Sequence, residues 1–151
     1  IVLAFCNRIK EAGYTPMIPM YTLGHNFSPA NIHAGGLRYH GAGSIVSQLK
    51  NDGYLEAVDI QQLETFKAAT MFAQAEGLIP APESSHAIAA AIREAEQAKL
   101  EGKSKVILFN LSGHGLIDMA AYDQFIMGDL ANYDVPQSEI DKNISQLEKL
   151  L

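Results

Sequence analysis

The sequence is poor in cysteine, tryptophan and basic residues, and it has no long hydrophobic run. Its 151 residues include one cysteine, no tryptophan and 11 lysines and arginines against 17 acidic residues. The single Cys6 excludes a disulfide framework and a cysteine metal site, and it favours a reducing, cytoplasmic compartment. The net charge of −6 argues against nucleic acid or an anionic membrane as a partner. No apolar run approaches the roughly 20 residues that cross a bilayer.

The remaining composition is typical of one soluble globular domain. Hydrophobic residues make up 48% and charged residues 19%, and a chain of 151 residues can bury one core. No internal repeat, low-complexity stretch or long linker divides the chain. It begins at Ile1, within an apolar segment and not at a methionine. We therefore expect residues 1–151 to be a single segment of a longer protein.

Apolar residues recur at helical spacing along much of the chain, and glycines follow several of these stretches, as at typical helix ends. Asp59 with Gln62 resembles a capping box, Ser84 or Ser85 can cap the following helix, and Pro136 suits a helix start. The predicted helices cover residues 2–12, 44–51, 59–77, 84–102, 118–127 and 136–151, the last of which is amphipathic.

Residues 105–115, with the sequence KVILFNLSGHG, contain the strongest strand signal. A short apolar run that ends in a glycine-rich turn is typical of a strand buried on both faces. Ligands of open α/β sheets bind beyond the carboxyl ends of such strands, where Ser112 and two glycines fall. A tight strand-to-helix connection with nothing bound explains the turn equally well. With a second short strand at 54–58 and an irregular or edge segment at 17–23, the pattern predicts a helix-rich α/β fold.

Two further segments have the composition of a binding site. Residues 25–43 are rich in glycine, histidine and asparagine and are expected to form a long loop, which in a compact domain is usually functional. The glycines of 35–43 could present carbonyls to a cation or N–H groups to an anion, or form a mobile surface loop. Residues 80–87 (PAPESSHA) gather a carboxylate and two hydroxyls at a helix start, where such residues are also ordinary caps.

The five histidines, at positions 25, 33, 40, 86 and 114, raise the question of a metal site. No two of them have the i, i+4 spacing that places two histidine ligands on one helical face, and the lone cysteine adds no ligand. We therefore interpret them as solvated or hydrogen-bonded loop histidines.

Four motifs occur in an order that resembles the C-terminal part of the tryptophan synthase β chain. Within that family the resemblance is to the second, TrpB-like branch, which pairs GLRYHG with SGHG, and it runs from about Gly13 to Asp129. The four motifs are MYTLGH at 20–25, HAGGLRYHG at 33–41, EGLIPAPESSHA at 76–87 and NLSGHG at 110–115.

The resemblance implies a pyridoxal-phosphate lyase of fold type II with a small, mostly parallel sheet. Ser112 would contact the pyridine nitrogen of the cofactor, Gly113 would let the backbone lie against the ring, and Glu83 would lie near the 3-hydroxyl group. A neutral ring nitrogen suits elimination and replacement at the β-carbon of the substrate. The backbone carbonyls of Tyr39 and Gly41 would hold a monovalent cation.

The resemblance also indicates what the chain lacks. The Schiff-base lysine and the glycine-rich phosphate cradle belong to the N-terminal half of the family, and none of the eight lysines here lies in a similar motif. Arg38 and His114, expected on the substrate side, replace an aspartate and an arginine of the main branch. The chain is therefore expected to be inactive alone, to need its N-terminal half, and to contribute to a homodimer that joins L-serine to indole.

Two alternatives remain open. The missing lysine and the amphipathic segment 136–151 are compatible with a non-catalytic α/β module that dimerises or binds a partner chain through an apolar face. A different member of the same cofactor fold, such as a relative of cysteine synthase, is disfavoured by the GLRYHG motif.

Overall fold

The computed structural model describes residues 2–5 and 19–149, which form two compact units. Unit 1 comprises residues 1–30, 38–58 and 134–151, and unit 2 comprises residues 31–37 and 59–133. The predicted single segment over 1–151 concerns the place of the chain in a longer protein, so it stays a prediction. In the described part of the chain, no helix is long and apolar enough to span a membrane.

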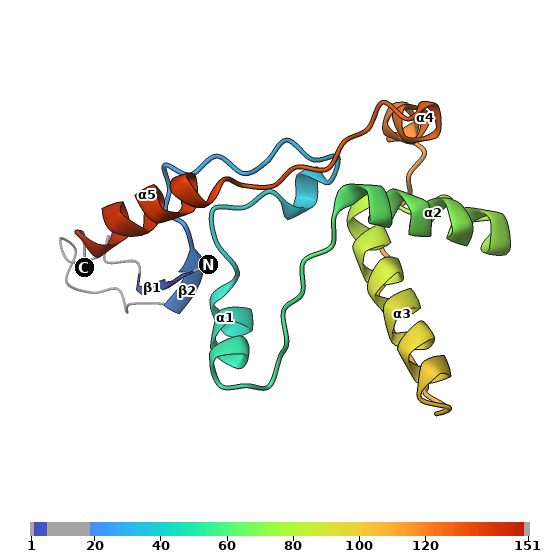
Figure 1. Cartoon of the computed structure of the whole chain (residues 1–151), viewed down its shortest axis with the longest axis horizontal. Coiled ribbons are helices and arrows are strands. Elements are labelled where there is room, and N and C mark those ends of the chain that lie inside the picture. Colours follow the sequence, from blue (N-terminus) through green and yellow to red (C-terminus); the bar gives the residue numbers. More distant parts are fainter. Residues whose placement is uncertain (1, 6–18, 150–151) are drawn as a thin grey trace. The chain divides into compact units, whose positions relative to one another are not determined.

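Unit 1 contains a two-stranded antiparallel sheet in which β1 (Val2–Phe5) pairs with β2 (Pro19–Thr22) (Figure 1). The prediction of a helix over 2–12 is wrong for residues 2–5, and residues 6–12 lie outside the described part. Four consecutive apolar residues fit a strand as well as one stripe of a helix, so periodicity could not separate the two. The edge-segment prediction for 17–23 is confirmed over β2, where a proline at the first strand position is tolerated.

A buried serine joins the first helix of unit 1 to the sheet. Helix α1 (Ser44–Asn51) covers the predicted residues, and Gly53 follows it with a φ of +80°. Ser47 is fully buried; its hydroxyl accepts a hydrogen bond from the Tyr21 N–H at 3.1 Å and donates one to the Ala42 carbonyl at 3.2 Å. The contact fixes α1 against β2.

Helix α5 (Gln137–Glu148) lies within the predicted terminal helix, with Pro136 as its N-cap residue. Its side chains divide into a more buried face and an exposed face, an arrangement typical of an amphipathic helix. The more buried face contains Ile140, Asn143, Ile144 and Leu147.

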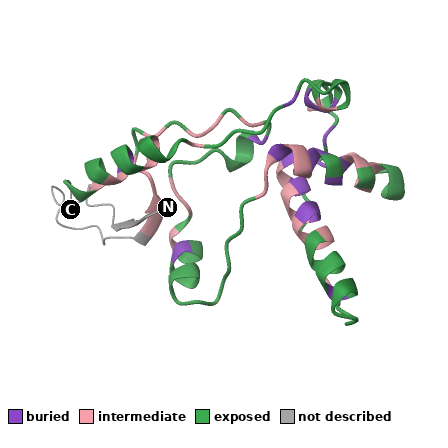
Figure 2. Ribbon diagram, in the orientation of Figure 1, coloured by how far each residue is buried: buried purple, intermediate pink, exposed green. Residues whose placement is uncertain are grey.

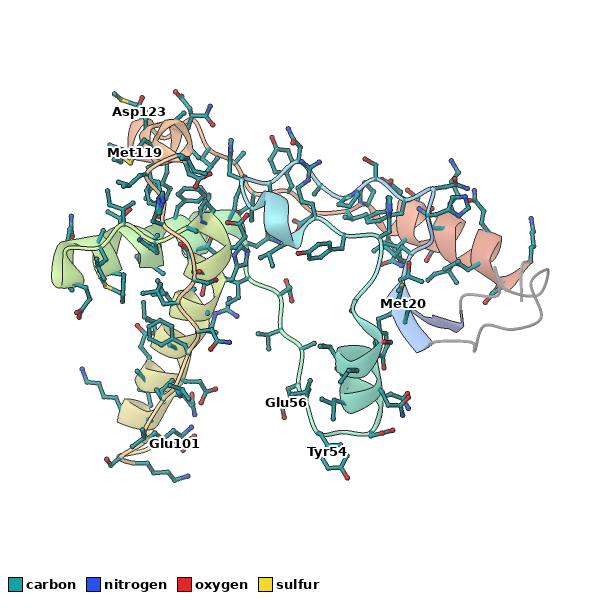
Figure 3. The ribbon with its side chains drawn as sticks, turned by 180° about the vertical axis from the view of Figure 1, so that it is seen from behind. Met20, Tyr54, Glu56, Glu101, Met119 and Asp123 are labelled. Atoms are coloured by element: carbon teal, nitrogen blue, oxygen red, sulfur yellow. The ribbon has the colours of Figure 1, made fainter. Side chains whose placement is uncertain are left out.

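Unit 2 consists of three α-helices and one short 3-10 turn. They are η1 (Gly35–Leu37), α2 (Gln62–Glu76), α3 (Pro82–Leu100) and α4 (Met119–Met127), the last marked by Met119 and Asp123 in Figure 3. Buried residues gather on α2 and on the first half of α3 (Figure 2). Buried hydrophobic residues of α2, α3, α4 and the segment after α4 form two clusters. One cluster contains Phe66, Ala69, Ala121, Tyr122 and Leu130, and the other contains Ala68, Ile88 and Ala89.

Two predicted helix starts in unit 2 are corrected by a few residues. Helix α2 begins at Gln62 after Gln61, so Asp59 does not cap it. Helix α3 begins at Pro82, which places Ser84 and Ser85 inside the first turn and not at the cap. Proline suits the first helical position because its fixed φ matches the helix and its missing N–H would be unpaired there.

The two strands predicted at 54–58 and 105–111 are absent from the structure. Residues 54–58 form an extended, exposed segment on which Tyr54 and Glu56 lie (Figure 3). Val106 and Leu108 are almost fully exposed, whereas Phe109 packs on the α2–α3 cluster. Alternating exposure is the pattern of a strand with one covered face, but in the described residues no neighbouring strand pairs with it.

An ion pair between α2 and α3 supplies a prediction about pH. The Arg93 guanidinium donates to both Glu64 carboxylate oxygens at 2.5 and 2.6 Å, and this hydrogen bonding holds the pKa of Glu64 below its usual value of 4.5. A carboxyl whose pKa is lowered by folding stabilises the fold above its unfolded pKa, and this stability is lost as pH falls through the folded value.

We therefore expect Glu64→Gln to reduce the free energy of unfolding slightly at neutral pH and to have a smaller effect at acidic pH, where the Glu64 carboxyl becomes protonated. The effect should be small and should shrink in high salt because both side chains are about half exposed. Urea denaturation at several pH values measures it, with the exposed Glu96→Gln as the matched control. An equal loss at both pH values would contradict the ion-pair explanation.

Candidate functional site

The first turn of α3 brings together two segments that are distant in the sequence. Pro82 occupies the first helical position, so the next residues, Glu83 and Ser84, project from the first turn. Glu83 contacts η1, and Ser84 contacts Ser112 in the loop before α4. All three segments belong to unit 2.

The side chain of Ser84 contacts both the backbone N–H and the backbone carbonyl of Ser112. The buried Ser84 hydroxyl donates to the Ser112 carbonyl at 2.6 Å and accepts from the Ser112 N–H at 3.1 Å. The hydroxyl oxygens of the two serines are 3.4 Å apart. Ser112 itself is exposed.

Glu83 is half-buried, and one of its carboxylate oxygens accepts a hydrogen bond from the Gly36 N–H at 2.8 Å. A Cβ atom on Gly36 would lie 3.1 Å from both the Cγ and the Oε1 of Glu83, so a larger residue would push the carboxylate away. The glycine at position 36 thus accommodates the close approach of Glu83 to η1.

The loop after Ser112 depends on glycines at two positions. Gly113 has a φ of +69°, a backbone conformation that residues other than glycine rarely adopt. The Gly115 N–H donates to the Ile79 carbonyl at 2.9 Å, and a Cβ there would lie 2.8 Å from the Ile79 Cγ2 and overlap the Pro80 carbonyl. The loop therefore packs directly on the residues that precede α3.

Tyr122 links the core to the same region. Its hydroxyl donates to the Pro80 carbonyl at 2.6 Å. The centroids of its ring and the Phe66 ring are 5.0 Å apart in an edge-to-face contact. Burial raises the pKa of Tyr122, which keeps the hydroxyl protonated and able to donate. The start of α3 is thus held from the core side as well.

Asp118 adds an acidic group that the sequence did not single out. Burial raises the pKa of its carboxyl, and the nearby Glu83 carboxylate raises it further, whereas His114 and His33 lower it. Asp118, the N-cap residue of α4, thus adds a third acidic or imidazole group to the electrostatics of Glu83 and His114. The sequence predicted Asp118 only as the first residue of a helix.

His114 has a defined hydrogen-bonding role in the loop. Its Nδ1 lies 3.3 Å from the Leu116 N–H and accepts from it. When the ring is neutral, its proton is then on Nε2, which can act as a donor, and the residue is exposed. His33 lies elsewhere in unit 2, with its Nε2 3.1 Å from the Gln124 side-chain oxygen.

The other three predicted site residues belong to unit 1. The Arg38 Nη2 donates to the Pro29 carbonyl at 3.5 Å, and Tyr39 is 64% exposed. Gly41 forms an isolated antiparallel bridge with Thr22, and a Cβ on it would overlap the Met20 side chain. Arg38, Tyr39 and Gly41 are thus not brought together with Ser112 within one unit. In the described residues, no group of three histidine, cysteine or acidic side chains could hold a metal ion.

No family model matches the chain, but its relatives are clear. The chain is 58% identical over 122 residues to the tryptophan synthase β chain 2 of Aquifex aeolicus, a match to 81% of this chain and 28% of the relative. It is 61% identical over 111 residues to tryptophan synthase β chain 2 of Thermotoga maritima, or 74% of this chain and 26% of the relative. The tryptophan synthase β chain of Pyrococcus horikoshii is 52% identical over 124 residues, or 82% and 27%.

The chain is homologous to part of the tryptophan synthase β chain. Identities of this size over three quarters or more of the chain confirm the resemblance, including that to the branch named chain 2. The chain spans about a quarter of the length of these relatives. The alternative of a non-catalytic binding module is not favoured by these matches.

Proposed function

We propose that the chain is the C-terminal part of a tryptophan synthase β-like lyase that binds pyridoxal phosphate and joins L-serine to indole. The observation that supports this proposal most is the convergence of Ser112, Gly113 and Glu83 at the start of α3. These are the residues that the resemblance assigns to the cofactor, and they come from segments 28 and more residues apart.

The chemistry of these groups fits one edge of an aromatic cofactor. The exposed Ser112 hydroxyl can donate to a neutral ring nitrogen, Gly113 presents backbone without a side chain, and the half-buried Glu83 precedes the serine that contacts Ser112. When bound, pyridoxal phosphate supplies an electron sink for elimination and replacement at the β-carbon of the substrate. The role of this chain is to hold and orient the ring and to set the protonation of its nitrogen.

On the substrate side, we propose contacts from Arg38 and from the Nε2–H of His114. The carbonyls of Tyr39 and Gly41 would bind a monovalent cation. Arg38 and His114 differ in charge from the aspartate and the arginine of the main branch, so the amino-acid substrate can differ as well.

The cofactor site proposed here is partial. The described lysines near α3 form ion pairs away from the first turn, as with Lys103 and Glu101 at 2.8 Å and Lys105 and Glu94 at 3.0 Å (Glu101 is labelled in Figure 3). We propose that the Schiff-base lysine and the phosphate cradle come from an N-terminal part of the enzyme. The chain would then be inactive alone, and the complete enzyme would be a cytoplasmic homodimer.

The apolar surface of unit 2 supports this proposal. Val106 and Leu108 expose their side chains almost completely, and an apolar groove of about 250 Å³ lies between α2, α3 and Phe109. Exposed apolar surface of this kind usually marks an interface. We propose that residues 105–109 form a strand of the small, mostly parallel fold-type II sheet when the N-terminal part is present.

The test is a chimera in which the 122 matched residues of this chain replace the corresponding segment of the Aquifex aeolicus β chain. We expect the chimera to show the Schiff-base absorbance of bound pyridoxal phosphate and to form tryptophan from serine and indole, whereas the 151-residue chain alone shows neither. Ser112→Ala should shift the absorbance and weaken cofactor binding about tenfold, because a hydrogen bond to the ring is lost.

Ser104→Ala, in the exposed turn after α3, is the matched control and should change neither the spectrum nor the affinity. A chimera that folds but gives the same spectrum with Ser112 and with alanine would contradict the assignment of Ser112. A chimera that folds and binds no cofactor would contradict the proposed function.

A further inference from the structure

The Ser84 hydroxyl makes an unusual pair of contacts. It donates to the carbonyl and accepts from the N–H of one and the same residue, Ser112. These two groups lie on the peptide planes on either side of the Ser112 Cα. Holding both planes from one buried atom fixes the direction in which the Ser112 side chain leaves the backbone.

The same contacts leave the Ser112 hydroxyl able to act elsewhere. A serine hydroxyl has one proton to donate, and that of Ser84 goes to the Ser112 carbonyl at 2.6 Å. The oxygen of the Ser112 hydroxyl is 3.4 Å from Ser84, near the limit of a hydrogen bond. Because the Ser84 proton is used, Ser112 is the donor in this long contact, and a ligand acceptor at a shorter distance can take its proton instead.

The neighbouring Ser85 provides an internal comparison. It is also buried, and its hydroxyl donates to the Ala81 carbonyl at 2.9 Å, within the start of its own helix. The two adjacent serines thus face different neighbours: Ser85 bonds within its own helix and interacts with Tyr122, whereas Ser84 bonds Ser112, 28 residues away. Capping of α3 explains neither contact, because the helix begins at Pro82.

We propose that Ser84 is a positioning residue, which sets the Ser112 hydroxyl at the angle needed to donate to the cofactor ring nitrogen. The inference rests on the proposed function for the role of Ser112, but the contact itself is a property of this chain. It predicts that removal of the Ser84 hydroxyl disturbs cofactor binding although Ser84 touches no ligand.

The first measurement is hydrogen exchange of the Ser112 amide in the 151-residue chain, followed by NMR. In Ser84→Ala the amide loses its acceptor, and we expect its exchange to become about five- to tenfold faster. Ser85→Ala leaves that acceptor in place, so exchange of the Ser112 amide should stay within twofold of the parent chain. Unchanged protection in Ser84→Ala would overturn the inference.

The second measurement is the spectrum of bound pyridoxal phosphate in the chimera. We expect Ser84→Ala to shift the absorbance in the same direction as Ser112→Ala, and the double variant to add little to Ser112→Ala. A shift with Ser112→Ala but none with Ser84→Ala would overturn the positioning role and leave the proposed function standing. No shift with either variant, together with a lost amide protection, would overturn both the ring contact and the positioning role.

Discussion

Replacement of Gly115 by alanine should destabilise unit 2 by about 2–3 kcal/mol, the cost of a methyl group forced into packed backbone. Gly115 is buried, and its Cβ would overlap the Pro80 carbonyl and lie 3.0 Å from the Tyr122 ring. Neither neighbour can retreat easily, because Tyr122 is itself bonded to the Pro80 carbonyl. Urea denaturation followed by circular dichroism measures the loss.

The same substitution should also speed exchange of the Ser112 amide, because the loop between them would have to shift away from Pro80. Gly35→Ala is the matched control in the same unit, since nothing lies within 4 Å of a Cβ at that position. A stability of Gly115→Ala equal to that of Gly35→Ala would contradict the close packing of the loop on the residues before α3.

The helices were largely predictable from the sequence, because their signals are local. Helix α1 covers the predicted residues, and α2 and α4 end at Gly77 and Gly128, both in the left-handed conformation. A glycine at such a position removes the steric cost of a positive φ, so it marks a helix end without tertiary information. The starts were less certain, because Asp59 and the serines after Pro82 offered caps that the chain does not use.

The strands could not be predicted in the same way, because a strand needs a partner. The run Val106 to Phe109 has the composition of a buried strand, yet hydrogen-bonded neighbours are absent from the described chain. Residues 2–5, which were predicted to be helical, pair with β2 as a strand. Pairing between distant segments is not encoded in the periodicity of either segment.

The candidate site shows a similar division. The sequence predicted three cofactor-site residues, Ser112, Gly113 and Glu83, because they lie within recognisable motifs. Their arrangement in unit 2 depends on the contacts of α3. Ser84 and Asp118 did not stand out, since serines and aspartates at helix starts are ordinary capping residues. The contact of Ser84 with Ser112 and the influence of Glu83 on the pKa of Asp118 join residues 28 and 35 positions apart, and they depend on how distant segments pack.

Phe66→Ala should have the largest effect on stability, a loss of about 3–5 kcal/mol. Phe66 is 1% exposed, and its ring packs against Tyr122 at 5.0 Å and Phe125 at 5.9 Å. Alanine would leave a cavity among rings that belong to α2 and α4, which cannot collapse without moving both helices. Urea denaturation measures the loss, and the half-buried Phe72→Ala is the control, with a smaller loss of about 1–2 kcal/mol.

The consequence for the site follows from the position of Tyr122. If the cavity lets Tyr122 move, the Pro80 carbonyl loses its buried donor, and the residues that lead into α3 lose a fixed point. Phe66→Ala should therefore also increase exchange of the Ser112 amide at low denaturant, whereas Phe66→Leu, which keeps most of the volume, should restore its protection. Equal exchange in the alanine and leucine variants would show that the core and the first turn of α3 are independent of each other.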